Sequence, residues 1–242
     1  MHRFYLPDFQ QLVLADGEAH HCIHVLRLKV GDTLNVFDGR GHEARCVIAE
    51  IVKKTVRLTL LQQSSTPPPR RRITLGQAIP KKSMDLIVEK ATELGVAAIA
   101  PLVSERTMVQ LDEDSKKPGR WRDIALEACK QCGNNWLPEI QPLQKAQNFL
   151  ASPGKFDLKL IASLQTGAKP LKTVLSNTPA LQHSSAPSVL ILIGPEGDFT
   201  PAELGLAKSA GCLPLSLGPL VLRSETAALY TLSILHYELQ SA

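Results

Sequence analysis

The sequence predicts an α/β domain with a parallel sheet, preceded by a small β-barrel. From Ile73 onward, short and nearly all-apolar strands alternate with helices, which is typical of a sheet covered on both faces. Before that point the strands are short and separated by turns. The stretch Ser64–Arg72 lies between the two patterns and carries three prolines and three arginines, so it reads as a semi-rigid linker. We therefore expect domains at residues 1–69 and 70–242.

The barrel elements follow from local signals. Thr33–Asp38 and His42–Ile51 flank a glycine turn, Asp38–Gly41, which indicates a β-hairpin. Thr55–Gln62 reads as a third strand, and Gly17–Arg27 as a short helix.

The elements of the second domain alternate regularly. Ser83 is placed to cap a helix that ends at Gly95, and Arg120–Cys132 and Ser224–Gln240 are further helices. The expected strands are Ile73–Ala78, Val96–Leu102, Leu158–Ala162, Val189–Ile193 and Leu213–Leu217.

The stretch Leu192–Leu204 is the most informative part of the chain. A strand that ends at Ile193 enters a turn with glycines at positions 194 and 197. A helix follows, for which Thr200 and Glu203 can form a capping box around Pro201. Such a junction presents free backbone amides to a ligand.

A second junction of the same kind follows soon after. Leu215–Pro219 is a strand and turn, and Leu220–Ala228 leads into the last helix. Two strand–turn–helix loops at the end of one α/β domain predict one composite pocket.

Composition narrows the class of protein. A hydrophobic content of 44% excludes wholesale disorder, and no apolar run of membrane-spanning length or signal-peptide pattern is present. The five cysteines lack the even number and regular spacing of a disulfide framework, which favours reduced thiols. We therefore expect a cytoplasmic protein. The net charge of +4 allows a nucleic-acid partner, whereas 5% aromatic residues argue against a base-stacking platform.

Several familiar motifs are rejected by their context. Gly39–Ala44 resembles a dinucleotide fingerprint but lies in the hairpin. Cys129 and Cys132 form a lone C-x-x-C within a helix, and no carboxylate lies at ligand spacing from the histidines near His20. We therefore expect no metal site.

A stripe of like charge runs along the Ser83 helix, and two interpretations of it are open. Asp85, Glu89 and Glu93 recur every four residues. They form either a solvated face that Lys82 and Lys90 partly offset, or a surface that orients arginines or a substrate.

The motifs of the two junctions resemble those of the RsmE family of 16S ribosomal RNA uridine N3-methyltransferases, in the SPOUT superfamily. The resemblance rests on Gly194–Gly197, Leu217–Pro219 and Leu222–Ala227. Further blocks follow in family order over nearly the whole chain: Arg3–Tyr5, His24–Arg27, Phe37–Gly39, Glu89–Val96, Ser104–Arg106 and Ala128–Gly133.

The resemblance implies a PUA-like barrel that holds RNA, and a SPOUT methyltransferase domain whose last part threads a trefoil knot. It also implies S-adenosylmethionine as cofactor, 16S ribosomal RNA of the 30S subunit as partner, and a homodimer through the knot region, with the Ser224–Gln240 helix as the dimer element. The same helix could equally be an interior core helix. No membrane or metal partner is implied.

Mapped onto this chain, the resemblance gives three sets of site residues. The cofactor-binding set is Leu164, Gly194, Pro195, Glu196, Gly197, Leu217, Gly218, Leu222, Ser224, Thr226 and Ala227. The RNA-binding set is Arg3, Arg27, Arg122 and Gln131, and the catalytic set is Arg223 and Glu225.

The chemistry of the target suggests the catalytic roles. Methyl transfer to uracil N3 requires loss of the N3 proton, so negative charge develops on O2 or O4. Arg223, beside the cofactor loop, is the candidate to stabilise that charge. Glu196 or Glu225 could assist proton removal, or either could instead orient loop amides.

Three positions depart from the family pattern. Asp198 stands where the family commonly has a second glycine, and aspartate tolerates unusual backbone angles better than most residues. Leu220 and Asn134 stand where arginine is frequent, which affects RNA or phosphate contact. Two alternatives stay open: a superfamily methyltransferase acting on another RNA position, and a non-catalytic RNA-binding or ribosome-assembly protein.

Overall fold

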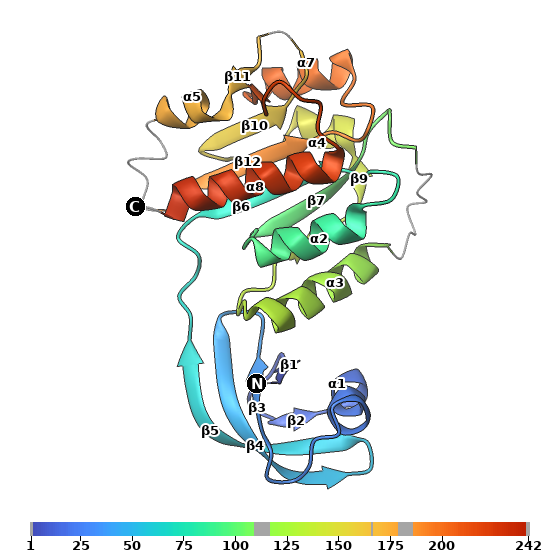
Figure 1. Ribbon diagram of the computed structural model, residues 1–242, viewed down its shortest axis with the longest axis vertical. Coiled ribbons are helices and arrows are strands. Elements are labelled where there is room, and N and C mark those ends of the chain that lie inside the picture. Colours follow the sequence, from blue (N-terminus) through green and yellow to red (C-terminus); the bar gives the residue numbers. More distant parts are fainter. Residues whose placement is uncertain (1, 109–116, 166, 179–185, 241–242) are drawn as a thin grey trace. The chain divides into compact units, whose positions relative to one another are not determined.

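The computed structural model describes residues 2–108, 117–165, 167–178 and 186–240 (Figure 1). The chain forms two compact units. The first comprises Met1–Pro68 together with Leu126–Leu137, and the second comprises Pro69–Ala125 and Pro138–Ala242. The sequence did not predict that a segment from the middle of the chain belongs to the first unit.

The first unit is a five-stranded sheet in the order β1-β3-β4-β5-β2. Phe4, Leu34 and Val56 are fully buried and lie in one apolar cluster with the small helical segment. The elements are β1 (Arg3–Tyr5), β2 (Val13–Leu14), α1 (Asp16–His20), the π-helix η1 (His21–Val25), β3 (Thr33–Phe37), β4 (His42–Val52) and β5 (Thr55–Ser65).

The predicted hairpin is confirmed, because β3 and β4 pair antiparallel. Its turn is closed by Asp38, whose Oδ1 accepts hydrogen bonds from the amides of Arg40 (2.7 Å) and His42 (3.0 Å). Oδ2 lies 2.6 Å from Nδ1 of His42. Burial acts to raise the pKa of the Asp38 carboxyl, but the hydrogen bonds from Arg40 and His42 outweigh it and lower this pKa from its usual value.

Two sequence boundaries in the first unit need correction. β5 continues to Ser65, because Ser64 and Ser65 still pair with Glu43 and His42 of β4, so the non-strand linker spans only residues 66–71. The predicted helix Gly17–Arg27 is a short α-helix followed by a π-turn. The helical segment ends at Val25, and Arg27, whose φ of 54° is left-handed, cannot continue a helix.

The second unit is built on a parallel sheet in the order β11-β13-β10-β12-β6-β7-β8, with β9 beside β7. The predicted parallel pairing is confirmed. The strands are β6 (Arg72–Ala78), β7 (Ala98–Val103), β8 (Glu139–Ile140), β9 (Gln144–Lys145), β10 (Leu158–Ala162), β11 (Lys169–Pro170), β12 (Ser188–Ile193) and β13 (Leu213–Ser216). The helices are α2 (Met84–Glu93), α3 (Lys117–Cys132, of which residues 126–132 belong to the first unit), α4 (Ala146–Ala151), α5 (Leu171–Ser176), α7 (Pro201–Ser209) and α8 (Ser224–Gln240).

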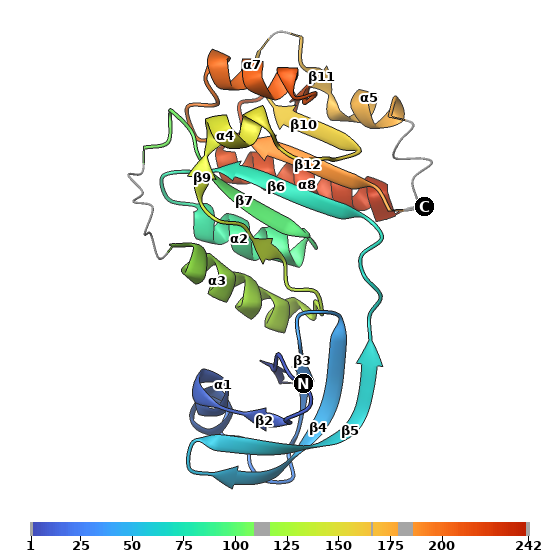
Figure 2. The ribbon, with the colours of Figure 1, turned by 180° about the vertical axis from the view of Figure 1, so that it is seen from behind.

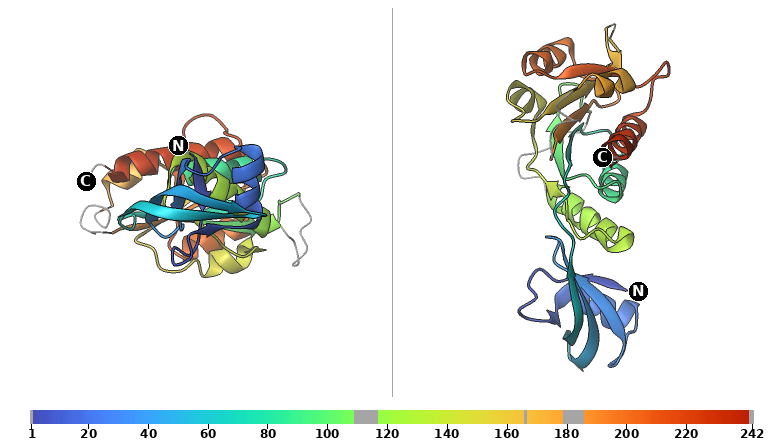
Figure 3. Two further views of the ribbon diagram at one scale, coloured as in Figure 1. Left: turned by 90° about the horizontal axis from the view of Figure 1, so that it is seen from below. Right: turned by 90° about the vertical axis from the view of Figure 1, so that its left-hand side faces the viewer.

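Helices cover both faces of this sheet. α2 and α8 pack together on one face, and α4 and α7 lie on the other (Figures 1 and 2). The right-hand view in Figure 3 shows the red α8 and the green α2 on the same side of the strands. Leu190, Leu192 and Leu102 are fully buried in the cluster that α4 and α7 cover, which explains why the strands are apolar along their length.

Both interpretations of the acidic stripe on α2 find support. Asp85 orients the first part of α3, because Oδ2 accepts from Arg120 Nη2 (2.5 Å) and Oδ1 from Trp121 Nε1 (3.2 Å). Glu89 and Glu93 instead share Lys90, each at 2.8 Å from its Nζ. The negative charge of the stripe is therefore offset by Lys90 at one end, and Asp85 positions Arg120 at the other.

Candidate functional site

The ends of three neighbouring strands form the candidate site. β13, β10 and β12 lie side by side and run parallel, so their carboxyl ends meet at one edge of the sheet, where α/β proteins bind ligands. The segments that follow them line a cavity of about 430 Å³, which is within the usual range for small-molecule sites. We name these segments loop A (residues 162–165 and 167–168), loop B (residues 193–198) and loop C (residues 216–222).

Loop B is a tight turn. The amide of Asp198 donates to the carbonyl of Pro195 at 2.9 Å, and Asp198 has a left-handed φ of 59°. The expectation that aspartate tolerates this backbone is confirmed. Gly194 is packed so closely that a Cβ there would lie 2.9 Å from Oδ1 of Asp198, so any larger residue would force the turn to shift.

The helix after loop B begins as predicted. Thr200 Oγ1 accepts from the amide of Glu203 (3.3 Å), and Glu203 Oε2 accepts from the amide of Thr200 (2.9 Å), with Pro201 in the first turn. Glu203 has a second role that the sequence did not reveal. It is fully buried, and its Oε1 also accepts from the amide of Glu105 at 3.1 Å.

Arg106 supports loop B from the segment after β7. Its Nη1 donates to the carbonyl of Gly197 at 2.5 Å, and a Cβ on Gly197 would lie 3.2 Å from Arg106 Cδ. The sequence placed Arg106 in a family block but gave it no role, because this pairing spans 91 positions of the chain.

The start of α8 is tied to loop B. Ser224 Oγ donates to the carbonyl of Gly194 at 2.7 Å. The same oxygen accepts from Nε2 of Gln77, at the end of β6, at 2.9 Å. Sequence reasoning missed Gln77, since nothing in its neighbourhood distinguishes it from an ordinary strand residue.

The two candidate glutamates both hold the segment before α2. Glu196 Oε1 accepts from the amide of Lys81 at 2.9 Å, and Glu225 Oε2 accepts from the hydroxyl of Ser83 at 2.8 Å. Ser83 does stand at the N-cap position of α2, but its side chain makes no capping bond. The expected cap is therefore wrong, because its hydroxyl is engaged by Glu225.

Most of the expected cofactor-binding residues meet at the cavity. Those that line it are Leu164, Gly194, Pro195, Glu196, Leu217, Gly218, Leu222, Ser224 and Ala227. Gly197 and Thr226 are outside its lining, and Leu220 and Val221, which the sequence did not assign to it, are inside. Leu164, Leu220 and Val221 are each more than two-thirds exposed, so apolar side chains stand open around the cavity.

Arg223 lies in the chain between two lining residues, Leu222 and Ser224, without lining the cavity itself. Its side chain is exposed, and it forms no hydrogen bond or ion pair within the described residues. A guanidinium in this position keeps its donors available for a substrate that arrives from solvent.

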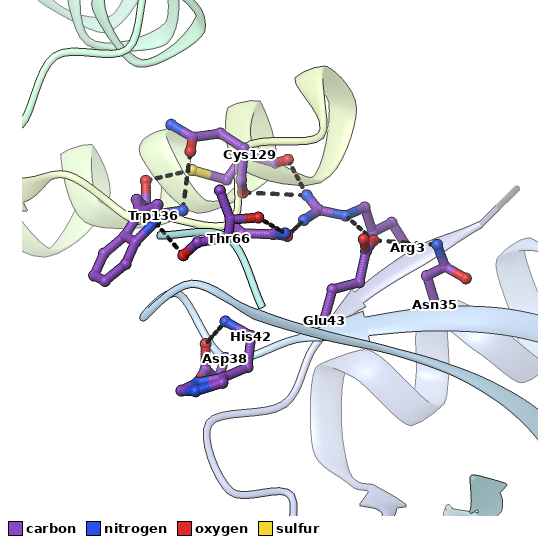
Figure 4. A network of polar contacts seen from close by, with 10 residues as sticks. Arg3, Asn35, Asp38, His42, Glu43, Thr66, Cys129 and Trp136 are labelled. Atoms are coloured by element: carbon purple, nitrogen blue, oxygen red, sulfur yellow. Dashed lines mark hydrogen bonds and ion pairs between the residues drawn. The ribbon is translucent and has the colours of Figure 1, made fainter. Parts of the chain in front are cut away.

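Arg3 differs from the other expected RNA-binding residues. Arg27, Arg122 and Gln131 are exposed, whereas the Arg3 side chain is only 8% exposed. Arg3 donates to Glu43 (3.1 Å) and to the carbonyl of Cys129 (2.5 Å), as Figure 4 shows. It also donates to Asn135. Arg3 thus holds the segment Leu126–Leu137 within the first unit.

Cys129 lies in the same network. Cys129 is buried, and burial raises the pKa of its thiol to about 12, with a smaller contribution from Cys132. Cys129 is therefore protonated at neutral pH and unsuited to nucleophilic chemistry. In the described part of the chain, no group of three possible metal ligands occurs and no helix is long and apolar enough to span a membrane.

The cavity suits a ligand that carries positive charge. Among the described residues that line it, the only charged side chains are those of Glu196 and Asp198, both acidic. Two carboxylates in a partly apolar cavity favour a cationic group such as a sulfonium. The residues present therefore fit S-adenosylmethionine.

Comparison with known proteins agrees with this geometry. A family described as RNA methyltransferase domain matches residues 66–236, and one described as RNA methyltransferase PUA domain matches residues 14–61. The chain is 30% identical to ribosomal RNA small subunit methyltransferase E of Bacillus subtilis, covering 98% of this chain and 97% of the relative. It is 33% identical to the protein of the same name from Synechocystis, covering 95% of this chain and 74% of the relative.

Solved structures give the same result. The ribosomal RNA small subunit methyltransferase E of Neisseria gonorrhoeae, bound to S-adenosylmethionine, is similar with a TM-score of 0.85, 31% identity and 98% coverage of both chains. A Legionella pneumophila protein solved with bound S-adenosylmethionine has a TM-score of 0.86 and 35% identity, covering 98% of this chain and 97% of its own.

Proposed function

Because this chain belongs to the family of ribosomal RNA small subunit methyltransferase E, we propose that it transfers the methyl group of S-adenosylmethionine to N3 of one uridine in 16S ribosomal RNA. The observation that carries the proposal is the cavity at the ends of β10, β12 and β13, where the motifs of loops B and C come together. The 16S ribosomal RNA of the small subunit is the substrate, and the cytoplasm is the compartment.

The three loops would hold the cofactor. Loop B and loop C offer glycine backbone at Gly194 and Gly218, and Leu164, Leu217 and Leu222 supply apolar surface for a flat ring. The remaining expected contacts, Gly197 and Thr226, adjoin lining residues in the chain. When bound, S-adenosylmethionine supplies an electrophilic methyl group on a positive sulfur.

The residues of the chain perform two tasks in the reaction. They must place the uracil in line with the methyl group, since methyl transfer depends on geometry. They must also stabilise the charge that develops on O2 or O4 as N3 loses its proton, and the exposed guanidinium of Arg223 is suited to this. Glu225 acts beside it, either as a proton acceptor or by holding Ser83.

RNA contact is shared by both units. We assign residues 1–69 as a PUA-like RNA-binding domain and residues 70–242 as the SPOUT methyltransferase domain. The exposed side chains of Arg27, Arg122 and Gln131 provide phosphate or positioning contacts. Arg3 supports the same function through its hold on the segment Leu126–Leu137.

The end of the chain carries the knot and the dimer contact in this proposal. β12 and β13 flank β10, yet α8 packs on β6 and β12, so loop C returns across the end of β10. This path supports a trefoil knot. Leu220 and Val221 of loop C and Tyr230 of α8 are exposed, and they would be covered by a second copy of the chain.

The test is transfer of a labelled methyl group to unmodified 30S subunits and, in parallel, to free 16S RNA. We expect Arg223→Ala to lower the turnover number about 100- to 1000-fold while cofactor binding is retained. Lys208→Ala, an exposed cation of α7 outside the cavity lining, is the control and should retain full activity. Cofactor binding without transfer to either RNA would favour a non-catalytic RNA-binding protein.

A further inference from the structure

Gln77 is a polar side chain in the middle of an apolar sheet. It pairs in register with Ile193 of β12, and its exposed fraction is 0%. A buried amide is unfavourable unless it is hydrogen-bonded, so its partners indicate why the position is polar. One of those partners, Ser224, lines the cavity.

The chemistry of its neighbours determines the orientation of the Gln77 amide. Nε2 lies 2.7 Å from the carbonyl oxygen of Ala78, which can only accept a hydrogen bond. A flipped amide would set two acceptor oxygens against each other, so the NH2 group must face Ala78. The second hydrogen of Nε2 is then directed to Ser224 Oγ at 2.9 Å.

The Ser224 hydroxyl has a single hydrogen. Its oxygen accepts from Gln77, so its hydrogen is available to the carbonyl of Gly194 at 2.7 Å. The three groups form a directed chain of hydrogen bonds from β6 through the start of α8 to loop B. Ser224 and Gly194 line the cavity, whereas Gln77 stands behind them.

We propose that Gln77 is a positioning residue for the cofactor site, which holds loop B and the start of α8 at the spacing that S-adenosylmethionine requires. The inference rests on the proposed function. Without the Gln77 donor, the Ser224 hydroxyl is free to rotate and its bond to Gly194 is no longer enforced. Cofactor binding must then order both segments, and a site that is not preorganised binds more weakly.

The tested variant is Gln77→Met, which keeps the volume and removes the donor. It also removes Oε1, a buried oxygen without a partner among the described residues, so the melting temperature should change little. We expect the dissociation constant for S-adenosylmethionine, measured by calorimetry, to rise about tenfold. Thr92→Val is the control, because Thr92 is equally buried but its hydroxyl donates within α2, to the carbonyl of Val88.

A double-variant cycle separates positioning from a general packing effect. If Gln77 acts through Ser224, the loss of affinity in Ser224→Ala should not increase when Gln77→Met is added. Additive losses, or a wild-type dissociation constant for Gln77→Met, would overturn the inference.

Hydrogen exchange of the cofactor-free protein tests the inference independently of the proposed function. The amides of residues 196–198 should exchange faster in Gln77→Met than in the wild type. Unchanged exchange would overturn the positioning role. Failure of the wild type to bind S-adenosylmethionine would contradict the proposed function and leave this exchange result to decide the role of Gln77.

Discussion

Gly194 and Asp198 approach each other so closely that a methyl group on Gly194 would lie 2.9 Å from Asp198 Oδ1 and 3.1 Å from its Cα. Loop B therefore closes on itself, and its shape depends on both residues. This turn places Pro195 and Glu196 in the lining of the cavity.

Gly194→Ala should lower stability by about 1–3 kcal/mol, because backbone as well as a side chain stands in the way of the added methyl group. We expect weaker binding of S-adenosylmethionine as well, since the turn lines the cavity. Urea unfolding and calorimetry measure the two effects. Gly205→Ala is the matched control: nothing lies within 4 Å of its Cβ position in α7, so this change should be stabilising. Equal effects of the two changes would contradict the role given to Gly194.

Position 198 should accept glycine with little loss of stability, whereas a β-branched residue there should be destabilising. At a φ of 59°, Asp198→Val is expected to cost about 1–2 kcal/mol, since valine disfavours the left-handed region. Asp198→Gly relieves the backbone but loses the 2.7 Å bond to the amide of Phe199, so its stability should stay within about 1 kcal/mol of the wild type. Thermal unfolding of the two variants side by side tests the ordering.

Arg106→Ala should weaken cofactor binding about tenfold, because the carbonyl of Gly197 loses its charged donor and loop B its packing partner. Arg120→Ala is the control, since Arg120 is bonded to Asp85 instead. Calorimetric titration with S-adenosylmethionine measures both. Equal affinity of the Arg106 variant and the wild type would show that loop B holds its shape unaided.

The lowered pKa of the Asp38 carboxyl makes the free energy of unfolding depend on pH. Its pKa is lower in the folded state than its usual value of 3.8, so its ionised form stabilises the fold. This contribution is fully present above pH 3.8 and is lost as the pH falls through the lowered folded pKa. The difference in unfolding free energy between wild type and Asp38→Asn should thus be largest near neutral pH and shrink in acid. Urea unfolding at several pH values would contradict this if the difference grew on acidification.

Features coded by neighbouring residues were predictable from the sequence. The capping box of Thr200 and Glu203 and the hairpin turn at Asp38 each depend on side chains within four positions of one another. The apolar strands were located for the same reason, since burial on both faces leaves a continuous local pattern.

Features that depend on distant partners were not predictable. Ser83 has the sequence context of a helix cap, yet its hydroxyl bonds Glu225, 142 positions away. Gln77 and Arg106 acquire their roles only when β6 and the segment after β7 are placed beside loop B. The inclusion of Leu126–Leu137 in the first unit likewise follows from the contacts of Arg3.

Methylation of uracil N3 can be detected by nucleoside mass spectrometry of 16S RNA from unmodified 30S subunits treated with the protein and S-adenosylmethionine. We expect 3-methyluridine at one site with the wild type, and a loss of this product with Arg223→Ala. A ribose-methylated or differently methylated nucleoside would contradict the assigned target while leaving a methyltransferase. RNA without any added methyl group would contradict the account as a whole.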